Sequence, residues 1–415
     1  MPVISSLKGR IVFNSRGSKS IEIDVITDKK FLGRACAPSG ASVGSHEVPS
    51  FIDNDPELTL QTFVSNMHKF IGADASNPIS ISEILKSIDT SNDFSRIGGA
   101  VTYGLSIAAA ASASASLNVP LFAMLNKKGP YRFPYPLGNI LGGGSHAGPG
   151  TPDIQEVLVC PLGAKNIMEA LQMNFNIHKE VRVLLEKIDK KFTYGRGDEG
   201  AWAPNLNNDE AVSTVAQAVE NSGLKLRKDI ALGIDFASSS MWDSKRKLYD
   251  YSRQGLVRNT EEQINFVEDL IKNYHLIYAE DPVNEDDFES MAIITKRNKN
   301  CYVTGDDMLV TSAVRISEAC KNGACNAAIL KVNQAGTLYN ALDFADKCTK
   351  NDIKIITSHR SGESVDAHIS HIALSTSSKM IKTGVVGGER VSKLNELLRL
   401  SEYDLIKGMI DLSFN

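Results

Sequence analysis

The chain has 415 residues, more than one ordinary domain, so it can hold a barrel of about 250 residues and a smaller second domain. A formal net charge of −4 gives no basic surplus, and we therefore expect neither a nucleic acid nor a membrane as a partner. Six cysteines without a C-x-x-C pair predict buried, reduced thiols and a cytoplasmic protein. The chain shows no signal-like N-terminal segment and no apolar stretch of membrane-spanning length.

Residues 1–130 are predicted to form an α+β cap domain. Residues 1–37 alternate in strand fashion between turn residues, which favours a three-stranded antiparallel meander. Helical patterns follow at Pro56–Ile71, Ser80–Thr90 and Gly98–Leu117. Strands followed by helices are typical of an α+β domain. The Pro-rich stretch Gly129–Pro136 is expected to lead into a second domain, residues 131–415.

Six short apolar runs in this second domain each end on a charged residue and then break into a loop. The charges are, in chain order, Asp235, Glu280, Asp306, Lys331, Arg360 and Lys382. Their spacings are 45, 26, 25, 29 and 22 residues, and all but the first suit one strand–helix repeat. Continuous apolar runs with long crossovers predict a parallel βα barrel, whose first strand we place near residue 155.

The chemistry of such barrels lies at the C-terminal ends of the strands, where these charges fall. Three carboxylates at one mouth repel each other unless a hard cation lies between them, and oxygen ligands suit Mg²⁺. We therefore expect Asp235, Glu280 and Asp306 to bind magnesium, with the three cationic residues facing an anionic substrate. The alternative is a set of salt bridges between strands, which the grouping of like charges on neighbouring strands disfavours.

Four further segments add candidate side chains. They are Ala37–Glu47 with Ser42, Leu141–Pro149 with His146, the strand start Gln155-Glu156, and Gly195–Asn205 with Asp198 and Glu199. Small residues and glycines let these loops move or approach a ligand closely, and a carboxylate at the start of an apolar strand is costly unless it is paired or bound. Taken singly, a flexible turn, a structural histidine and a solvated acidic turn explain the loops equally well.

With these residues placed, the chain resembles the enolase family from Asn14 to Arg399. The most specific shared motifs are LKVNQAGT, SHRSGE and the GDEG loop. The resemblance implies an α/β fold in which a TIM-like, enolase-type barrel carries a smaller N-terminal α+β domain. It also implies Mg²⁺-dependent, reversible dehydration of 2-phospho-D-glycerate to phosphoenolpyruvate through an enolate, in glycolysis and gluconeogenesis. The family is usually homodimeric, so we expect a homodimer or a higher homo-oligomer.

The resemblance further implies a role for each candidate residue. Lys331 is the base at C2, Glu199 the acid at the 3-hydroxyl, and Lys382 the partner of the substrate carboxylate. Arg360 and Ser361 bind phosphate, while His146, Gln155, Glu156, Asp198 and His359 line the pocket, His146 and Glu156 among the catalytic groups. Two Mg²⁺ ions are implied, the tighter one on Asp235, Glu280 and Asp306, and the second near Ser42 in a closing loop. Charge arguments add that neighbouring cations and metal lower the pKa of Lys331, and that Glu199 is protonated at the step in which hydroxide leaves.

The chain departs from the usual enolase pattern at four positions. Asn14 stands where Asp is more common, Val43 where Thr is usual, Gly142 where Asn is common, and Ala201 where a second glycine follows Glu199. Every charged catalytic group is present, which disfavours a purely non-catalytic binding role. Another lyase of the wider superfamily, acting on a different carboxylic acid, is the alternative enzyme, but such lyases generally lack SHRSGE and the GDEG loop.

Overall fold

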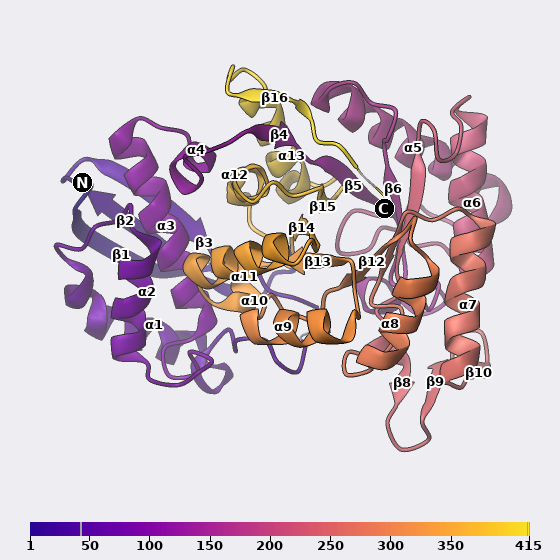
Figure 1. Ribbon diagram of the computed structural model, residues 1–415, viewed down its shortest axis with the longest axis horizontal. Coiled ribbons are helices and arrows are strands. Elements are labelled where there is room, and N and C mark those ends of the chain that lie inside the picture. Colours follow the sequence, from indigo (N-terminus) through magenta and orange to yellow (C-terminus); the bar gives the residue numbers. More distant parts are fainter. Residues whose placement is uncertain (42–43, 413, 415) are drawn as a thin grey trace.

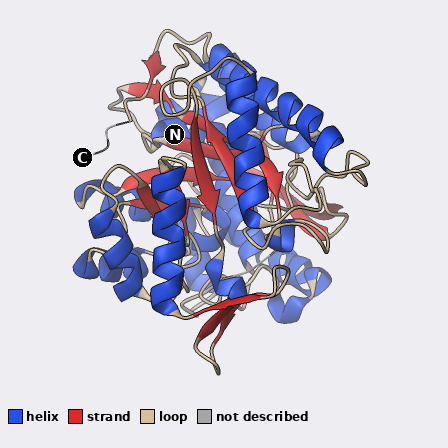
Figure 2. Ribbon diagram, turned by 90° about the vertical axis from the view of Figure 1, so that its right-hand side faces the viewer, coloured by secondary structure: helices blue, strands red, loops and turns tan. Residues whose placement is uncertain are grey.

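The computed structural model describes residues 1–41, 44–412 and 414. A small sheet with helices packed on it lies beside a larger closed barrel, and further helices surround the barrel (Figure 1). The view from the side shows the strands at the centre and most helices on the outside (Figure 2). This is the α/β fold that the sequence predicted, a closed barrel with a smaller N-terminal α+β unit.

The N-terminal sheet is an antiparallel meander in the order β1-β2-β3. Its strands are β1 (Ile4–Phe13), β2 (Lys19–Thr27) and β3 (Phe31–Cys36), and its helices are α1 (Pro56–Asn66), α2 (Pro78–Ile88), α3 (Gly99–Leu117) and α4 (Leu121–Leu125). The sheet buries Ile21, Ile23 and Val25 of β2 completely. Gly33 lets β3 approach α3, because a Cβ there would lie 2.0 Å from the carbonyl oxygen of Ala108.

Contrary to the expectation from the sequence, helix α3 is long and apolar enough to cross a membrane by length and composition alone. However, 72% of its apolar window is buried inside the protein. Its Ala- and Ser-rich surface contacts β2 and β3, with Ser112 Oγ donating to the carbonyl oxygen of Phe31 at 2.7 Å. Small side chains therefore serve close packing of this helix against the sheet.

The barrel closes in the order β11-β12-β13-β14-β15-β5-β6-β7. Its strands are β5 (Tyr135–Gly142), β6 (Glu156–Cys160), β7 (Ala231–Asp235), β11 (Tyr278–Glu280), β12 (Tyr302–Gly305), β13 (Ala327–Leu330), β14 (Lys354–Ser358) and β15 (Met380–Gly384). Strand β6 runs antiparallel to both of its neighbours, whereas the other pairs are parallel. The expectation of an entirely parallel barrel was wrong at this strand.

Two other details of the barrel differ from the sequence prediction. The first strand is β5 rather than the run near residue 155, because the Pro- and Gly-containing segment Tyr135–Gly142 pairs with β15 and β6. The long first spacing of 45 residues contains an inserted three-stranded sheet between β7 and α7. Its strands are β8 (Trp242–Asp243), β9 (Leu248–Tyr251) and β10 (Leu256–Arg258), which project at the bottom of Figure 1.

The helices of the second half follow the barrel strands. They are α5 (Ile167–Ile188), α6 (Asn208–Asn221), α7 (Thr260–Asn273), α8 (Phe288–Arg297), α9 (Ala313–Asn322), α10 (Val332–Ala335), α11 (Leu338–Lys350), α12 (His368–Ser375) and α13 (Gly388–Leu400). Reciprocal capping boxes start α6 at Asn207 and α7 at Asn259, satisfying amide groups that lack partners at a helix start. Two short strands, β4 (Tyr131–Phe133) and β16 (Ile406–Met409), pair outside the barrel.

Candidate active site

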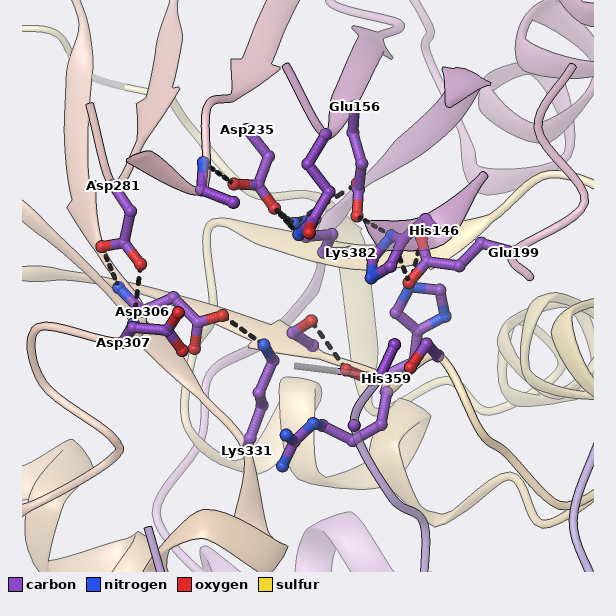
Figure 3. A pocket seen from close by; sticks show the side chains of 17 residues that line it. His146, Glu156, Glu199, Asp235, Asp281, Asp306, Asp307, Lys331, His359 and Lys382 are labelled. Atoms are coloured by element: carbon purple, nitrogen blue, oxygen red, sulfur yellow. Dashed lines mark hydrogen bonds and ion pairs between the residues drawn. The ribbon is translucent and has the colours of Figure 1, made fainter. Parts of the chain in front are cut away.

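A polar cavity opens at the C-terminal ends of the barrel strands. It is lined by Gly40, Ala41, His146, Gln155, Glu156, Glu199, Asp235, Ala237, Asp281, Asp306, Asp307, Lys331, Ser358, His359, Arg360, Ser361 and Lys382 (Figure 3). The structure thus brings together all the candidate catalytic, substrate-binding and metal residues except two. Glu280 is fully buried and does not line the cavity itself, and Ser42 lies outside the described residues. Asp198, which was also expected to line the pocket, does not line this cavity, and its carboxylate lies 3.4 Å from Arg16 Nε instead.

The strand ends explain why residues so distant in sequence converge. Asp235 and Glu280 are the last residues of β7 and β11, and Asp306 and Lys331 directly follow β12 and β13. Lys382 lies within β15. Parallel strands end at the same edge of a barrel, so each of these charges meets the others there.

The ammonium group of Lys382 lies between three carboxylates. Its Nζ atom is 2.6 Å from Glu280 Oε2, 2.8 Å from Asp235 Oδ2 and 3.3 Å from Glu156 Oε2. Burial disfavours the charged ammonium, but these carboxylates outweigh burial and hold the pKa of Lys382 well above its usual value. Lys382 is therefore charged, and in this structure it neutralises part of the predicted metal site.

The donor set fits a hard divalent cation. Glu280 Oε1 is buried and has no hydrogen-bond partner among the described residues, which is costly for an anionic oxygen unless a cation binds it. Carboxylate oxygens of Asp281, Asp306 and Asp307 lie within 4.8 Å of one another, a second grouping that the sequence did not suggest. Asp281 accepts hydrogen bonds from the backbone N–H groups of Asp306 and Asp307, and so fixes the start of the loop that follows β12.

Lys331 forms a close ion pair with Asp306. Burial and the nearby Arg360 and Lys382 act in the direction that the sequence predicted, but the carboxylates of Asp306 and Glu280 together outweigh them and raise the pKa of Lys331. The expectation of a lowered pKa was therefore wrong for the protein without bound cations. Neutralising Asp306 with a cation would remove the largest influence that keeps Lys331 protonated.

A second cluster surrounds Glu199 on the opposite side of the cavity (Figure 3). His146 Nδ1 lies 3.2 Å from Glu156 Oε1 and 3.6 Å from Glu199 Oε1, and His359 Nε2 lies 3.2 Å from Glu199 Oε2. Burial alone would raise the pKa of Glu199, but His359 and His146 outweigh it and hold that pKa well below its usual value. Burial and the charge of Glu199 instead raise the pKa of Glu156. In the protein without substrate the two imidazoles thus favour the ionised form of Glu199, whereas the sequence-based prediction of a protonated Glu199 concerns the step in which hydroxide leaves.

The comparisons agree with this geometry. The family described as "Enolase, N-terminal domain" matches residues 4–125, and "Enolase, C-terminal TIM barrel domain" matches residues 130–408. The "Enolase" of Methanosphaera stadtmanae is 42% identical over 414 residues, covering 99% of each chain. That of Methanothermobacter thermautotrophicus is 40% identical over 416 residues, again covering 99% of each chain, and that of Pyrobaculum aerophilum is 38% identical over 95% of each. This chain belongs to the enolase family.

The two enolase matches meet between residues 125 and 130. We propose that the boundary between the domains lies at residues 130 and 131, as the sequence suggested. The domains also touch at the cavity, where Ser39 and Gly362 form a pair of backbone hydrogen bonds of 2.8 Å each. The loop from the N-terminal domain is therefore anchored to the SHRSGE turn of the barrel.

One residue of this enolase site that the sequence reasoning missed is Arg390, which is fully buried in α13. Its guanidinium donates to the carbonyl oxygens of Arg360, Ser361 and Asp198, joining the SHRSGE turn to the GDEG loop. It also lies 2.8 Å from His359 Nδ1, and because a guanidinium can only donate, that nitrogen accepts. The proton of the neutral His359 is then on Nε2, facing Glu199. Arg390 lies in the segment GERVSKLNELLR, and nothing in the spacing of that segment indicates this contact.

A second missed contact links the phosphate-binding candidate Arg360 to Glu47. Both side chains are almost fully buried, and Glu47 accepts from both terminal nitrogens of Arg360, at 2.8 and 2.9 Å. Gln334 donates both to Glu47 Oε1 at 3.2 Å and to Asp306 Oδ1 at 3.1 Å. Glu47 and Gln334 therefore connect the candidate phosphate site to the candidate metal site.

Two of the departures from the family pattern lie against each other. A Cβ added at Gly142 would lie 3.5 Å from the Cβ of Ala201, an ordinary contact. Compared with the usual family pattern, the chain thus has a smaller residue at position 142 and a larger one at position 201, which lies against it. Asn14 accepts from the backbone of Arg16 and Ser18 and donates to Ser39 Oγ at 2.9 Å, a donation that an ionised Asp could not make. Val43 lies outside the described residues.

Proposed function

We propose that this chain is a glycolytic and gluconeogenic phosphopyruvate hydratase, which interconverts 2-phospho-D-glycerate and phosphoenolpyruvate with Mg²⁺. The single observation that carries this proposal is the cavity of Figure 3, where opposed cationic and acidic groups of an enolase-family chain face one another. The enzyme is accordingly a lyase whose substrate is a small phosphorylated acid.

The cationic side of the cavity suits the substrate. Ser361 Oγ is buried and has no hydrogen-bond partner among the described residues, so its hydroxyl can donate a hydrogen bond to a phosphate oxygen. Arg360 presents a planar fork that Glu47 orients, which suits a second phosphate contact. We propose that these two residues bind the phosphate and that Lys382 pairs with the carboxylate. Gln155 and His359 complete the binding surface.

We propose Asp235, Glu280 and Asp306 as ligands of one Mg²⁺ and the Ser42 segment as a contributor to a second. When bound, the ions supply positive charge that stabilises the substrate carboxylate as it becomes more negative. Lys331 takes the proton from C2. Glu199 passes a proton to the departing 3-hydroxyl, and before that step the proton is held on the neighbouring His146 or Glu156, whose pKa values are both raised.

The test is a spectrophotometric assay for phosphoenolpyruvate formed from 2-phosphoglycerate, with and without Mg²⁺. D-glycerate, which lacks the phosphate, is the matched substrate, and we expect no turnover of it. Turnover of D-glycerate in preference to the phosphorylated acid would assign the chain to another lyase of the superfamily.

The variant Arg360→Lys keeps the charge at the phosphate site and loses the fork. We expect its kcat/KM for 2-phosphoglycerate to fall by at least about tenfold, since a point charge cannot replace a bidentate contact. The control Arg297→Lys alters an exposed ion pair with Glu268 and should leave kcat/KM unchanged. An unaltered kcat/KM in Arg360→Lys would remove Arg360 from the substrate site.

We also propose that the chain forms a homodimer or a higher homo-oligomer in the cytoplasm. The support is the family membership. Light scattering on the purified protein measures the mass directly, and a monomeric mass at micromolar concentration would contradict the proposal.

A further inference from the structure

Tyr278 is a buried tyrosine inside the barrel that the proposed reaction does not use. It opens β11 two residues before Glu280, so both side chains lie on the same face of the strand. Its ring packs among interior residues of the barrel such as Leu158, Ile329 and Ile356. The exposed fraction of Tyr278 is 0%, so its hydroxyl needs a partner within the protein.

That partner is the carboxylate of Glu280. The hydroxyl donates to Glu280 Oε2 at 2.5 Å, and Lys382 Nζ donates to the same oxygen at 2.6 Å. The other oxygen, Oε1, is buried without any hydrogen-bond partner among the described residues. Two donors thus hold one side of the carboxylate in place, and the unpartnered side carries lone pairs that suit a hard cation.

The neighbouring strand is shaped to admit this ring. Gly233 of β7 lies directly beside Tyr278 in the sheet. A Cβ at Gly233 would lie 2.9 Å from Tyr278 Cβ, closer than real Cβ atoms approach, and 3.1 Å from its Cδ1, tighter than most real contacts. The position of the ring, and hence of its hydroxyl, therefore depends on the glycine.

We propose that Tyr278 is a positioning residue that holds Glu280 by Oε2 and thereby keeps Oε1 directed to a divalent cation. The proposal rests on the proposed function, because it takes Glu280 as a ligand of Mg²⁺. Groups that hydrogen-bond a metal ligand fix its orientation, and their removal typically weakens metal affinity by about 10–100-fold. Tyr278 is thus expected to set how tightly the site holds Mg²⁺ without touching the ion or the substrate.

The test is calorimetric titration of Mg²⁺ into EDTA-treated, dialysed protein without substrate. In Tyr278→Phe the ring stays and only the hydroxyl is lost, and we expect the Mg²⁺ Kd to rise by about 10–100-fold. The control is Tyr251→Phe, whose hydroxyl donates to Gln263 at 2.8 Å and whose exposed fraction is also 0%. It loses a comparable buried hydrogen bond in the inserted sheet, so its melting temperature should fall while its Mg²⁺ Kd stays unchanged.

A second variant, Gly233→Ala, keeps the hydroxyl but displaces the ring, and it should also raise the Mg²⁺ Kd. An unchanged Kd in Tyr278→Phe, with the unsubstituted protein binding Mg²⁺, would overturn this inference and leave the proposed function intact. An equal rise in Tyr251→Phe would overturn it too, because the effect would then follow general destabilisation. Failure of the unsubstituted protein to bind Mg²⁺ would overturn both the metal proposal and this inference.

Discussion

Glu199 and Glu156 lie against the same imidazole, yet their pKa values are shifted in opposite directions. Glu199 faces His359 as well as His146, whereas Glu156 has the charge of Glu199 nearby and is fully buried. The ionisation of each carboxylate is thus decided by one or two immediate neighbours rather than by the total charge of the pocket. This cluster can hold a proton close to the substrate without every member being protonated.

The two proton transfers can be separated by substitution. Lys331→Ala should lose both elimination and exchange of the C2 hydrogen of 2-phosphoglycerate with deuterated solvent. Glu199→Gln should lose elimination by roughly 10²–10⁴-fold, the usual effect of a positioned acid or base, while C2 exchange survives because Lys331 is intact. Proton NMR of the substrate in D₂O, with circular dichroism to show that both variants are folded, makes the measurement. Exchange retained in Lys331→Ala and lost in Glu199→Gln would reverse the two roles.

At the scale of residues, the sequence predicted which charges converge but not how they pair. The strand-end positions of Asp235, Asp306 and Lys331 followed from the apolar runs before them. The ion pair of Lys331 with Asp306, and the contact of Arg390 with His359, join segments whose relative orientation no local pattern encodes. For this reason the sequence placed Lys331 and Glu199 at one cavity but did not indicate the pKa shifts that their neighbours cause in the protein without metal and substrate.

At the scale of elements, apolar runs indicate that a strand exists but not its direction. The run Glu156–Cys160 is buried on both sides whether it lies parallel or antiparallel, so its reversal could not be seen in the sequence. The segment Tyr135–Gly142 contains proline and two glycines, residues that weaken a strand pattern, and its pairing depends on the neighbours β15 and β6. Barrel closure therefore supplied a strand that local propensity did not favour.

Helix α5 positions the GDEG loop through one histidine. His178 Nε2 lies 3.0 Å from the carbonyl oxygen of Gly200, its ring stacks on Trp202 at 4.6 Å, and its own carbonyl oxygen accepts from the indole. Burial lowers the pKa of His178 to about 4. The imidazole is therefore neutral at physiological pH, and the loop that carries Glu199 is fixed to the helix by an uncharged contact.

The low pKa of His178 makes a prediction for stability. Because the folded-state pKa lies below the unfolded value of about 6.5, this contribution is fully present above pH 6.5 and is lost as the pH falls toward 4. The difference between the folded and unfolded pKa values of His178 corresponds to at most about 3 kcal/mol of unfolding free energy. Urea unfolding at pH 7.5 and 4.5 should show a smaller loss of stability in His178→Gln than in the unsubstituted protein.

The control for this measurement is His68→Gln, which replaces a surface histidine of the N-terminal domain. It should lose as much stability between the two pH values as the unsubstituted protein does. If His178→Gln also loses that same amount, His178 does not titrate in this range, and the neutral contact with Gly200 is not what links stability to pH.

At the scale of the whole molecule, the cavity belongs to both domains. Ser39 and Glu47 come from the N-terminal domain, and they bind Gly362 and Arg360 of the barrel. The carboxylates of the candidate metal site come from several barrel strands, so a bound cation crosslinks elements that are far apart in the chain. Binding of a ligand to the folded state alone stabilises it by mass action, and unfolding separates these carboxylates completely.

Mg²⁺ should therefore raise the melting temperature of the whole chain, and EDTA should lower it and abolish activity. At a free concentration of 100 times its Kd, the ion adds about 2.7 kcal/mol to the free energy of unfolding. In Asp306→Asn one anionic ligand is lost, so the same Mg²⁺ concentration should produce a much smaller shift in melting temperature, and activity should need far more Mg²⁺.

The control Asp346→Asn alters an exposed carboxylate paired with Lys350 on α11 and should show the full shift in melting temperature. Differential scanning calorimetry with a Mg²⁺ series measures both, with Na⁺ at equal ionic strength separating binding from screening. Equal shifts in Asp306→Asn and Asp346→Asn would show that the stabilising ion binds elsewhere, and full activity of the EDTA-treated protein would contradict a metal-dependent reaction.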